Sequence, residues 1–146
     1  LQCEFSYIFA DKKYPGVPEI DVITIADELF MIGDIPVQPI KVWHLHMPVL
    51  GFRIGDFTYI TDANRIDPEE LQKTLGSKVL VLNALRKEKH LSHFTLSEAI
   101  EVSQQIGANQ TYFTHISHQL GLHQDICAEL PSGIRLAHDG LVINLP

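Results

Sequence analysis

The apolar residues of the chain fall into short separate runs in the first half and into alternating helical and extended patterns in the second half. In the first half, turn residues separate the apolar runs, a pattern typical of a β meander. The strands expected there cover residues 21–25, 29–32, 37–43, 51–54 and 58–61, with the last two joined by a hairpin turn at residues 55–56.

From Asp62 onward, the pattern predicts helices and strands in alternation. Asp67-Pro68-Glu69-Glu70 supplies an N-cap, a proline at the first helical position and a capping-box acid, and Gly76 would end that helix. The aliphatic run 79–82 indicates a strand that is buried on both faces. Thr95-Leu96-Ser97-Glu98 is a second capping box, and its helix would end at Gly107. The remaining expected elements are a strand at 111–114, a helix at 124–130, and paired short strands at 134–137 and 141–145.

The beginning of the chain predicts an incomplete domain. Phe5, Ile8 and Phe9 stand at helical spacing, so residues 1–10 are expected to be the last turns of a helix that starts before Leu1. A meander followed by a βαβα pattern predicts a sheet with helices on one face, and its other face would need a second layer that residues 1–146 do not contain. The expected fold class is therefore α/β, with part of the domain missing.

Composition narrows the function classes. The formal net charge is −7, which argues against a nucleic-acid partner, because phosphate backbones are bound through an excess of Lys and Arg. Cys3 and Cys127 are the two cysteines, and their wide spacing predicts a reduced, cytoplasmic protein without a disulfide framework. The sequence has no run of about 18 apolar residues, so no contact with a membrane is expected.

Chemically capable residues recur where the expected strands end. His44 and His46 follow the third strand, Asp62 follows the fifth, His93 lies in the loop before a helix, and His115 follows the last buried strand. The carboxyl ends of strands in an open α/β sheet meet at one edge, where ligands bind. Imidazoles with one carboxylate are the ligands preferred by zinc and similar transition metals. The sequence therefore predicts one metal site assembled from several strand ends.

The segments Tyr59-Ile60-Thr61-Asp62-Ala63, Ser92-His93-Phe94 and Thr114-His115-Ile116-Ser117-His118-Gln119 resemble the metallo-β-lactamase superfamily. Within it, the chain looks most like the branch that contains phosphoribosyl cyclic-phosphate phosphodiesterases and tRNA 3′-processing endonucleases. The likeness covers residues 1–146 as the carboxyl-terminal half of an αββα sandwich.

The resemblance implies a role for each site residue. Asp62 would bridge two divalent ions, zinc or manganese, His44 and His115 would each bind one ion, and His93 would protonate the departing oxygen. Arg86, Lys87 and His118 are weaker candidates for binding the substrate.

The chain departs from the family in one large respect. The H-x-H-x-D-H hallmark that supplies most of the metal ligands is absent, since His44-Leu45-His46 lacks the following Asp-His. The hallmark is expected upstream of Leu1. His44 is preferred to His46 as the ligand that precedes the fifth strand, and His46 is the alternative.

The expected function is a metal-dependent phosphodiesterase that acts on a small, cyclic phosphate ester through a hydroxide held between two metal ions. Two alternatives stay open: a non-catalytic interaction module on the same fold, and a nuclease of the tRNA 3′-processing type. With His44, Asp62 and His115 as its only ligands, the isolated segment is expected to bind metal weakly, to be inactive, and to form a homo-oligomer through its uncovered sheet face.

Overall fold

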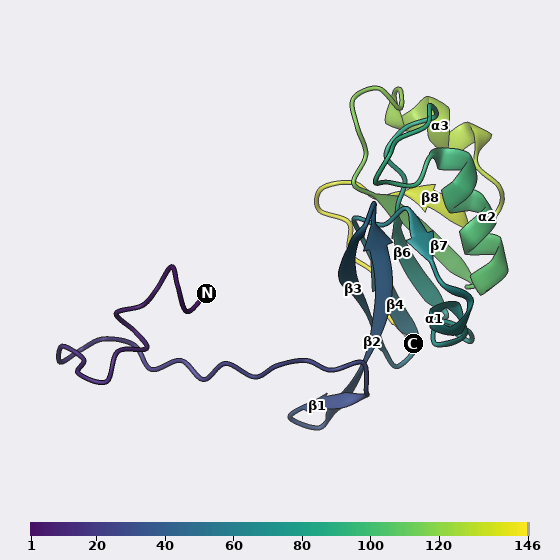
Figure 1. Ribbon diagram of the computed structural model, residues 1–146. Helices are drawn as coiled ribbons and strands as arrows, with labels where there is room; N and C mark the ends of the chain where they lie inside the picture. Colours follow the sequence, from purple (N-terminus) through teal and green to yellow (C-terminus); the bar gives the residue numbers. More distant parts are fainter. Residues whose placement is uncertain (146) are drawn as a thin grey trace.

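The computed structural model describes residues 1–145 and contains one mixed sheet of eight strands (Figure 1). The strands are β1 Phe30–Ile32, β2 Ile35–His44, β3 Met47–Ile54, β4 Phe57–Ile60, β5 Arg65–Ile66, β6 Val79–Asn83, β7 Gln110–Thr114 and β8 Ile134–Leu136. They lie in the order β1-β2-β3-β4-β6-β7-β8, and β5 pairs with β2 outside that path.

The sheet has an antiparallel part and a parallel part. The chain passes from the first to the second near Asp62, where the sequence pattern changes. Strands β1 to β4 form the expected antiparallel meander, and β4, β6, β7 and β8 are parallel to one another. All five residues of β6 are buried, as the aliphatic run predicted. The parallel strands all present their carboxyl ends at the same edge of the sheet.

The described residues form three helices, α1 Pro68–Gln72, α2 Leu96–Ile106 and α3 His123–Glu129, and Figure 1 shows them on one side of the sheet. Helix α2 has the predicted capping box between Thr95 and Glu98, and it ends at Gly107 in the left-handed conformation, with φ 69°. A left-handed residue costs least when it is glycine, so the helix stops where the sequence predicted.

The core lies between these helices and the sheet. Ile60, Leu82 and Phe113 are paired with one another across the neighbouring strands β4, β6 and β7, and all three side chains are fully buried. The opposite face is less well covered, and Tyr59 is 41% exposed there. One face of the sheet is therefore packed against helices and the other is only partly covered, as the sequence predicted.

Several expected elements are not formed. Residues 1–10 form turns closed by short-range bonds such as Phe5 N–H to Leu1 O, so the prediction of helix there was wrong. Residues 21–25 and 141–145 have no strand pairing, and β8 pairs in parallel with β7 instead of forming a hairpin. Short helices and unpaired strands are only marginally stable unless they pack against other elements. The intrinsic propensity of their residues is not enough to keep them folded.

Helix α1 is also shorter than predicted and lacks its predicted cap. The Asp67 side chain makes no capping bond, because its carboxylate accepts from Trp43 Nε1 at 2.7 Å. Glu70 is buried, and its carboxylate accepts from the Lys41 backbone N–H and from Lys73 Nζ. Asp67 and Glu70, which the sequence pattern assigned to the helix cap, thus form tertiary hydrogen bonds instead.

The amino-terminal segment of about the first 29 residues is an extended arm that leaves the sheet at β1 (Figure 1). Many of its apolar side chains are exposed, including Ile23 at 85% and Val22 at 50%, whereas Ile8 is buried. Among the described residues, no helix combines the length and apolar character that crossing a membrane requires.

Candidate metal centre

Four of the predicted residues meet at the carboxyl edge of the sheet. His44 ends β2, Asp62 lies two residues after β4, and His115 follows β7 directly. His93 stands in the loop between β6 and α2, just before the capping box. The sequence had placed these residues at separate strand ends, and the sheet order brings those ends together.

Asp62 is the centre of the group. Its Oδ1 atom lies 3.4 Å from Nε2 of His93 and 3.6 Å from Nε2 of His115. One carboxylate oxygen thus faces two imidazoles that come from different loops. A carboxylate oxygen beside imidazoles is a donor that a transition-metal ion can use.

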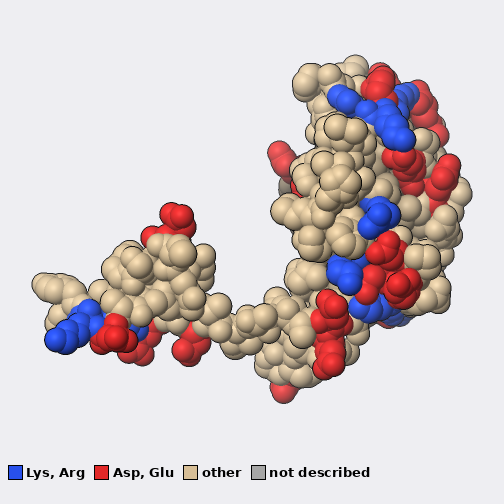
Figure 2. All heavy atoms as spheres, in the orientation of Figure 1, with Lys and Arg blue, Asp and Glu red and all other residues tan. Residues whose placement is uncertain are grey.

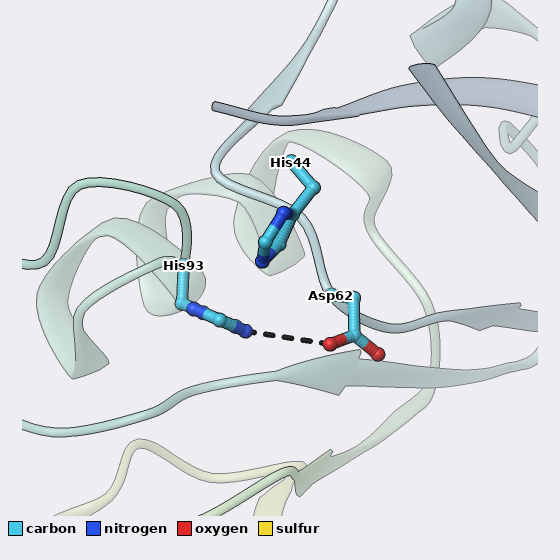
Figure 3. A group of neighbouring side chains, drawn as sticks. All are labelled: His44, Asp62 and His93. Carbon is cyan, nitrogen blue, oxygen red and sulfur yellow. Dashed lines mark hydrogen bonds and ion pairs between the residues drawn. The ribbon is translucent and has the colours of Figure 1, made fainter. Parts of the chain in front are cut away.

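The imidazole rings are in mutual contact. The His93 ring stacks on His115 with the ring centroids 4.7 Å apart, and it meets His44 edge-on at 4.8 Å. Figure 3 shows His93 pointing at the Asp62 carboxylate, with the His44 ring beside this pair. Ligand atoms of His44, Asp62 and His93 all lie within 4.8 Å of one another, which makes these residues a candidate group for holding a metal ion.

Main-chain hydrogen bonds hold these loops in register. Phe94 N–H donates to Ala63 O at 2.8 Å, which ties the residue after His93 to the residue after Asp62. Asn64 N–H donates to Trp43 O at 2.8 Å, which ties the Asp62 loop to the end of β2. These bonds therefore fix the backbone beside His44, Asp62 and His93.

Asn83 is a positioning residue that the sequence analysis missed. It is fully buried at the end of β6, and its side chain accepts from Ala63 N–H and donates to Ala63 O, both at 2.9 Å. A buried amide must find such partners, because an unsatisfied polar group is costly. The available signal was an asparagine at the end of an otherwise aliphatic strand.

Asn64, Ser92 and His90 also support the site and were not assigned a role from sequence. Asn64 Oδ1 accepts from Leu45 N–H at 2.9 Å, which fixes the turn after His44. On the far side of the His93 ring, Nδ1 lies 3.0 Å from Ser92 Oγ and 3.1 Å from His90 Nδ1. These neighbours orient the His93 imidazole toward Asp62.

The surroundings shift two pKa values. Burial raises the pKa of the Asp62 carboxyl, but the charge of His115 and hydrogen bonds from His93 and Thr61 outweigh it and leave the pKa below its ordinary value. Burial lowers the pKa of His93; its bond to Asp62 raises it, and the charges of His115, His44 and His90 lower it further. The site thus favours an ionised Asp62, the form that binds metal, and a neutral His93.

The structure also places the remaining sequence candidates. His46 is exposed two residues beyond His44 and outside the three-residue group, and His118 is exposed three residues after His115. Arg86 Nη1 donates to Gln119 Oε1 at 2.6 Å, and Lys87 pairs with Glu129 at 2.8 Å. Figure 2 likewise shows basic side chains interspersed with acidic ones on the face in view.

The model of the beta-lactamase superfamily domain matches residues 1–116. The chain belongs to the metallo-β-lactamase superfamily. The mixed sheet is the corresponding fold.

Individual relatives differ in how much of their length the chain covers. A diphosphatase of the PhnP family is 32% identical with a TM-score of 0.87, and the match covers 99% of this chain and 54% of that one. An octanoyltransferase of Porphyromonas gingivalis is 34% identical over 137 residues, which are 92% of this chain and 28% of that protein. Zinc-bound PqqB from Methylobacterium extorquens shares the fold at 16% identity and a TM-score of 0.66, over 90% of this chain and 57% of that one. The chain thus spans about half or less of each relative.

Proposed function

We propose that residues 1–146 form part of a metal-dependent hydrolase that cleaves a phosphodiester, in a small cyclic phosphate ester or a related metabolite. The observation that carries the proposal is the position of Asp62 Oδ1, within 3.6 Å of both His93 and His115. The likeness to a PhnP-family diphosphatase supports phosphoester chemistry, because that match covers 99% of this chain. The octanoyltransferase match covers only 28% of that protein, so we do not assign acyl transfer to this chain.

The donor set fits zinc or manganese. His44 and His115 offer neutral imidazole nitrogens and Asp62 offers a carboxylate, the mixture that these ions prefer. We propose that Asp62 contacts two ions and that His44 and His115 contact one each. Catalytic zinc sites use about three protein ligands per ion, so these three residues leave both ions short of ligands.

The missing ligands would then come from outside residues 1–146. Two observations support this arrangement: the match covers 54% of the diphosphatase chain, and one face of the sheet is only partly covered. Residues 1–146 would be the carboxyl-terminal half of the sandwich. On their own they would bind zinc or manganese weakly and would not turn over a phosphodiester.

His93 is the proposed general acid. A carboxylate only accepts hydrogen bonds, so the contact with Asp62 Oδ1 places a proton on His93 Nε2. His93 Nδ1 can then accept from the Ser92 hydroxyl, which keeps the proton on the side that faces Asp62. When bound, the metal ions would supply an activated water at neutral pH and would polarise the phosphoryl oxygens. Once Nδ1 is also protonated, His93 would give its Nε2 proton to the leaving oxygen and return to the neutral imidazole, and Asp62 would hold the ring in place.

The test is hydrolysis by the full-length polypeptide loaded with manganese or zinc. Bis-nitrophenyl phosphate and a ribose cyclic phosphate are the phosphodiester substrates, and an acyl thioester is the comparison. We expect metal-dependent hydrolysis of the phosphodiesters, and we expect residues 1–146 alone to be inactive. Hydrolysis of the thioester without phosphodiester cleavage would overturn the assignment.

The exposed arm favours a second candidate, a non-catalytic interaction module on the same fold. Ile23 and Leu29 on this arm are 85% and 55% exposed, and apolar surface of this kind marks contact sites. A metal-loaded full-length polypeptide that cleaves neither substrate class but associates through the arm would favour the module. The acidic net charge of −7 gives no support to a tRNA-processing nuclease.

A further inference from the structure

A second cluster of metal-binding side chains lies near α3 and β8, and the proposed function does not use it. Helix α3 places His123 and Cys127 four residues apart, so both side chains lie on one face of the helix. Cys127 Sγ lies 3.8 Å from Nδ1 and 3.9 Å from Nε2 of His123. His138 follows β8 by two residues, and its ring centroid is 5.9 Å from that of His123.

Backbone carbonyls orient both imidazoles. His123 Nε2 lies 3.3 Å from Leu136 O, and His138 Nδ1 lies 3.0 Å from Asp139 O. A carbonyl oxygen can only accept, so each of these nitrogens carries a proton. The lone pairs that remain are on Nδ1 of His123 and Nε2 of His138. His123 is therefore held as metal-binding histidines are, with the second nitrogen donating to a carbonyl.

The cluster opens onto a cavity of about 510 Å³. His123, Cys127 and His138 all line this cavity, together with Tyr112 and Arg135. None of its lining residues belongs to the cluster around Asp62. The cavity is large enough to give an ion and a water molecule access to the thiol.

We propose that Cys127, His123 and His138 form a zinc site separate from the Asp62 centre, with its fourth position open to this cavity. Zinc–sulfur and zinc–nitrogen bonds of about 2.3 Å and about 2.0 Å place the two ligand atoms about 3.5 Å apart in a tetrahedral site. The observed separation of 3.8 Å between Cys127 Sγ and His123 Nδ1 is close to this value. Binding releases the thiol proton to solvent, and the thiolate then binds the metal.

His138 must rotate toward the thiol to complete the three-ligand set. Its side chain is exposed, and exposed side chains change rotamer rapidly, so packing does not oppose this movement. Arg135 lines the same cavity, and its positive charge favours an anion there. The open position is therefore suited to water or a small anion.

Cobalt(II) gives a direct readout, because a thiolate ligand produces a sulfur-to-cobalt charge-transfer band in the near ultraviolet. The Asp62 centre offers only nitrogen and oxygen ligands, so the band reports on the second site alone and does not depend on hydrolase activity. We expect the band in the wild-type protein and in Cys3→Ser, a matched control that removes the exposed second thiol. We expect it to be lost in Cys127→Ser.

Two further measurements guard against misfolding and adventitious binding. His123→Gln and His138→Gln keep the thiol, and each should weaken cobalt binding about tenfold or more. In the Cys3→Ser background, zinc should slow labelling of Cys127 by a disulfide reagent at least tenfold, with unchanged circular dichroism. A band that persists in Cys127→Ser would overturn the proposal. A thiol whose labelling zinc does not slow would overturn it as well, and would leave Cys127 and His123 as a hydrogen-bonded pair only.

Discussion

Asp62 and His115 both adopt the left-handed backbone conformation, with φ 56° and 58°, and their side chains meet across 3.6 Å. For residues other than glycine this conformation is uncommon and costs roughly 1–2 kcal/mol. Each residue lies just past the end of a parallel strand, so the left-handed turn directs its side chain into the shared edge of the sheet. Strained residues of this kind cluster at functional sites, and Asp62 and His115 are both proposed metal ligands. Among the described residues, the other non-glycine residue with positive φ is Leu45, at 58°, which directly follows the proposed ligand His44.

Replacing the shared carboxylate should remove both ions. In the metal-loaded full-length polypeptide, we expect Asp62→Ala to abolish phosphodiester hydrolysis and to reduce the metal content, because both ions lose a ligand and a negative charge. Elemental analysis after dialysis measures the bound metal. Asp56→Ala removes a carboxylate that pairs with Lys78 on the surface, and it should keep both ions. Two tightly held ions in Asp62→Ala would contradict the bridging role.

The backbone strain at Asp62 should be measurable apart from catalysis. We expect Asp62→Gly to have a free energy of unfolding about 1 kcal/mol higher than Asp62→Ala, because glycine adopts a positive φ without steric cost. Urea unfolding of the two variants measures the difference. At neighbouring Thr61, which is not among the residues with positive φ, alanine should be the more stable replacement. The same order at both positions would refute strain at Asp62.

Removing the proposed acid should affect poor leaving groups most. His93→Ala should keep its metals and lose roughly 10²–10⁴ in rate on an alkyl phosphodiester, because no group protonates the departing oxygen. A nitrophenyl ester needs little protonation, so its rate should fall much less. Steady-state kinetics on the two substrates test this directly. Equal losses on both would exclude the acid role.

His93 should also make the stability of the metal-free protein depend on pH. Burial lowers its pKa in the folded state, below the unfolded value of about 6.5. Its contribution to stability is therefore complete above that pH and is lost as the pH falls through the folded-state pKa. Between about pH 7 and about pH 5, the urea midpoint of the wild type should fall more than that of His93→Gln. Parallel curves for the two proteins would show that His93 titrates alike in both states.

The exposed arm should drive association of residues 1–146. We expect a dimer or larger assembly in sedimentation velocity, because Ile23 and Val22 are 85% and 50% exposed. The double change Ile23→Asp and Val22→Asp should shift the population to monomer. Leu122→Asp, at a residue that is 67% exposed in the loop before α3, should leave the assembly unchanged. A monomeric wild-type segment would contradict this prediction.

Local signals in the sequence determined the elements whose stability is mostly local. Helix α2 begins at the Thr95–Glu98 capping box and ends at Gly107, because neighbouring residues satisfy its end groups. Strand β6 was predictable because a strand buried on both faces must be apolar throughout. The positions of Asp62 and His115 just past strand ends also followed from the pattern, and the resemblance supplied their proposed roles.

Tertiary structure alone decided the rest, because the deciding partners are distant in sequence. Asn83 holds Ala63 across 20 positions, and the acids expected to cap α1 bind Trp43 and Lys41 instead. Among the described residues, residues 1–10 form turns and residues 21–25 pair with no strand, so their helical and strand patterns are not realised. Whether the His93 ring reaches Asp62 depends on the sheet order and on the bond between Phe94 and Ala63. No local pattern records contacts of that kind.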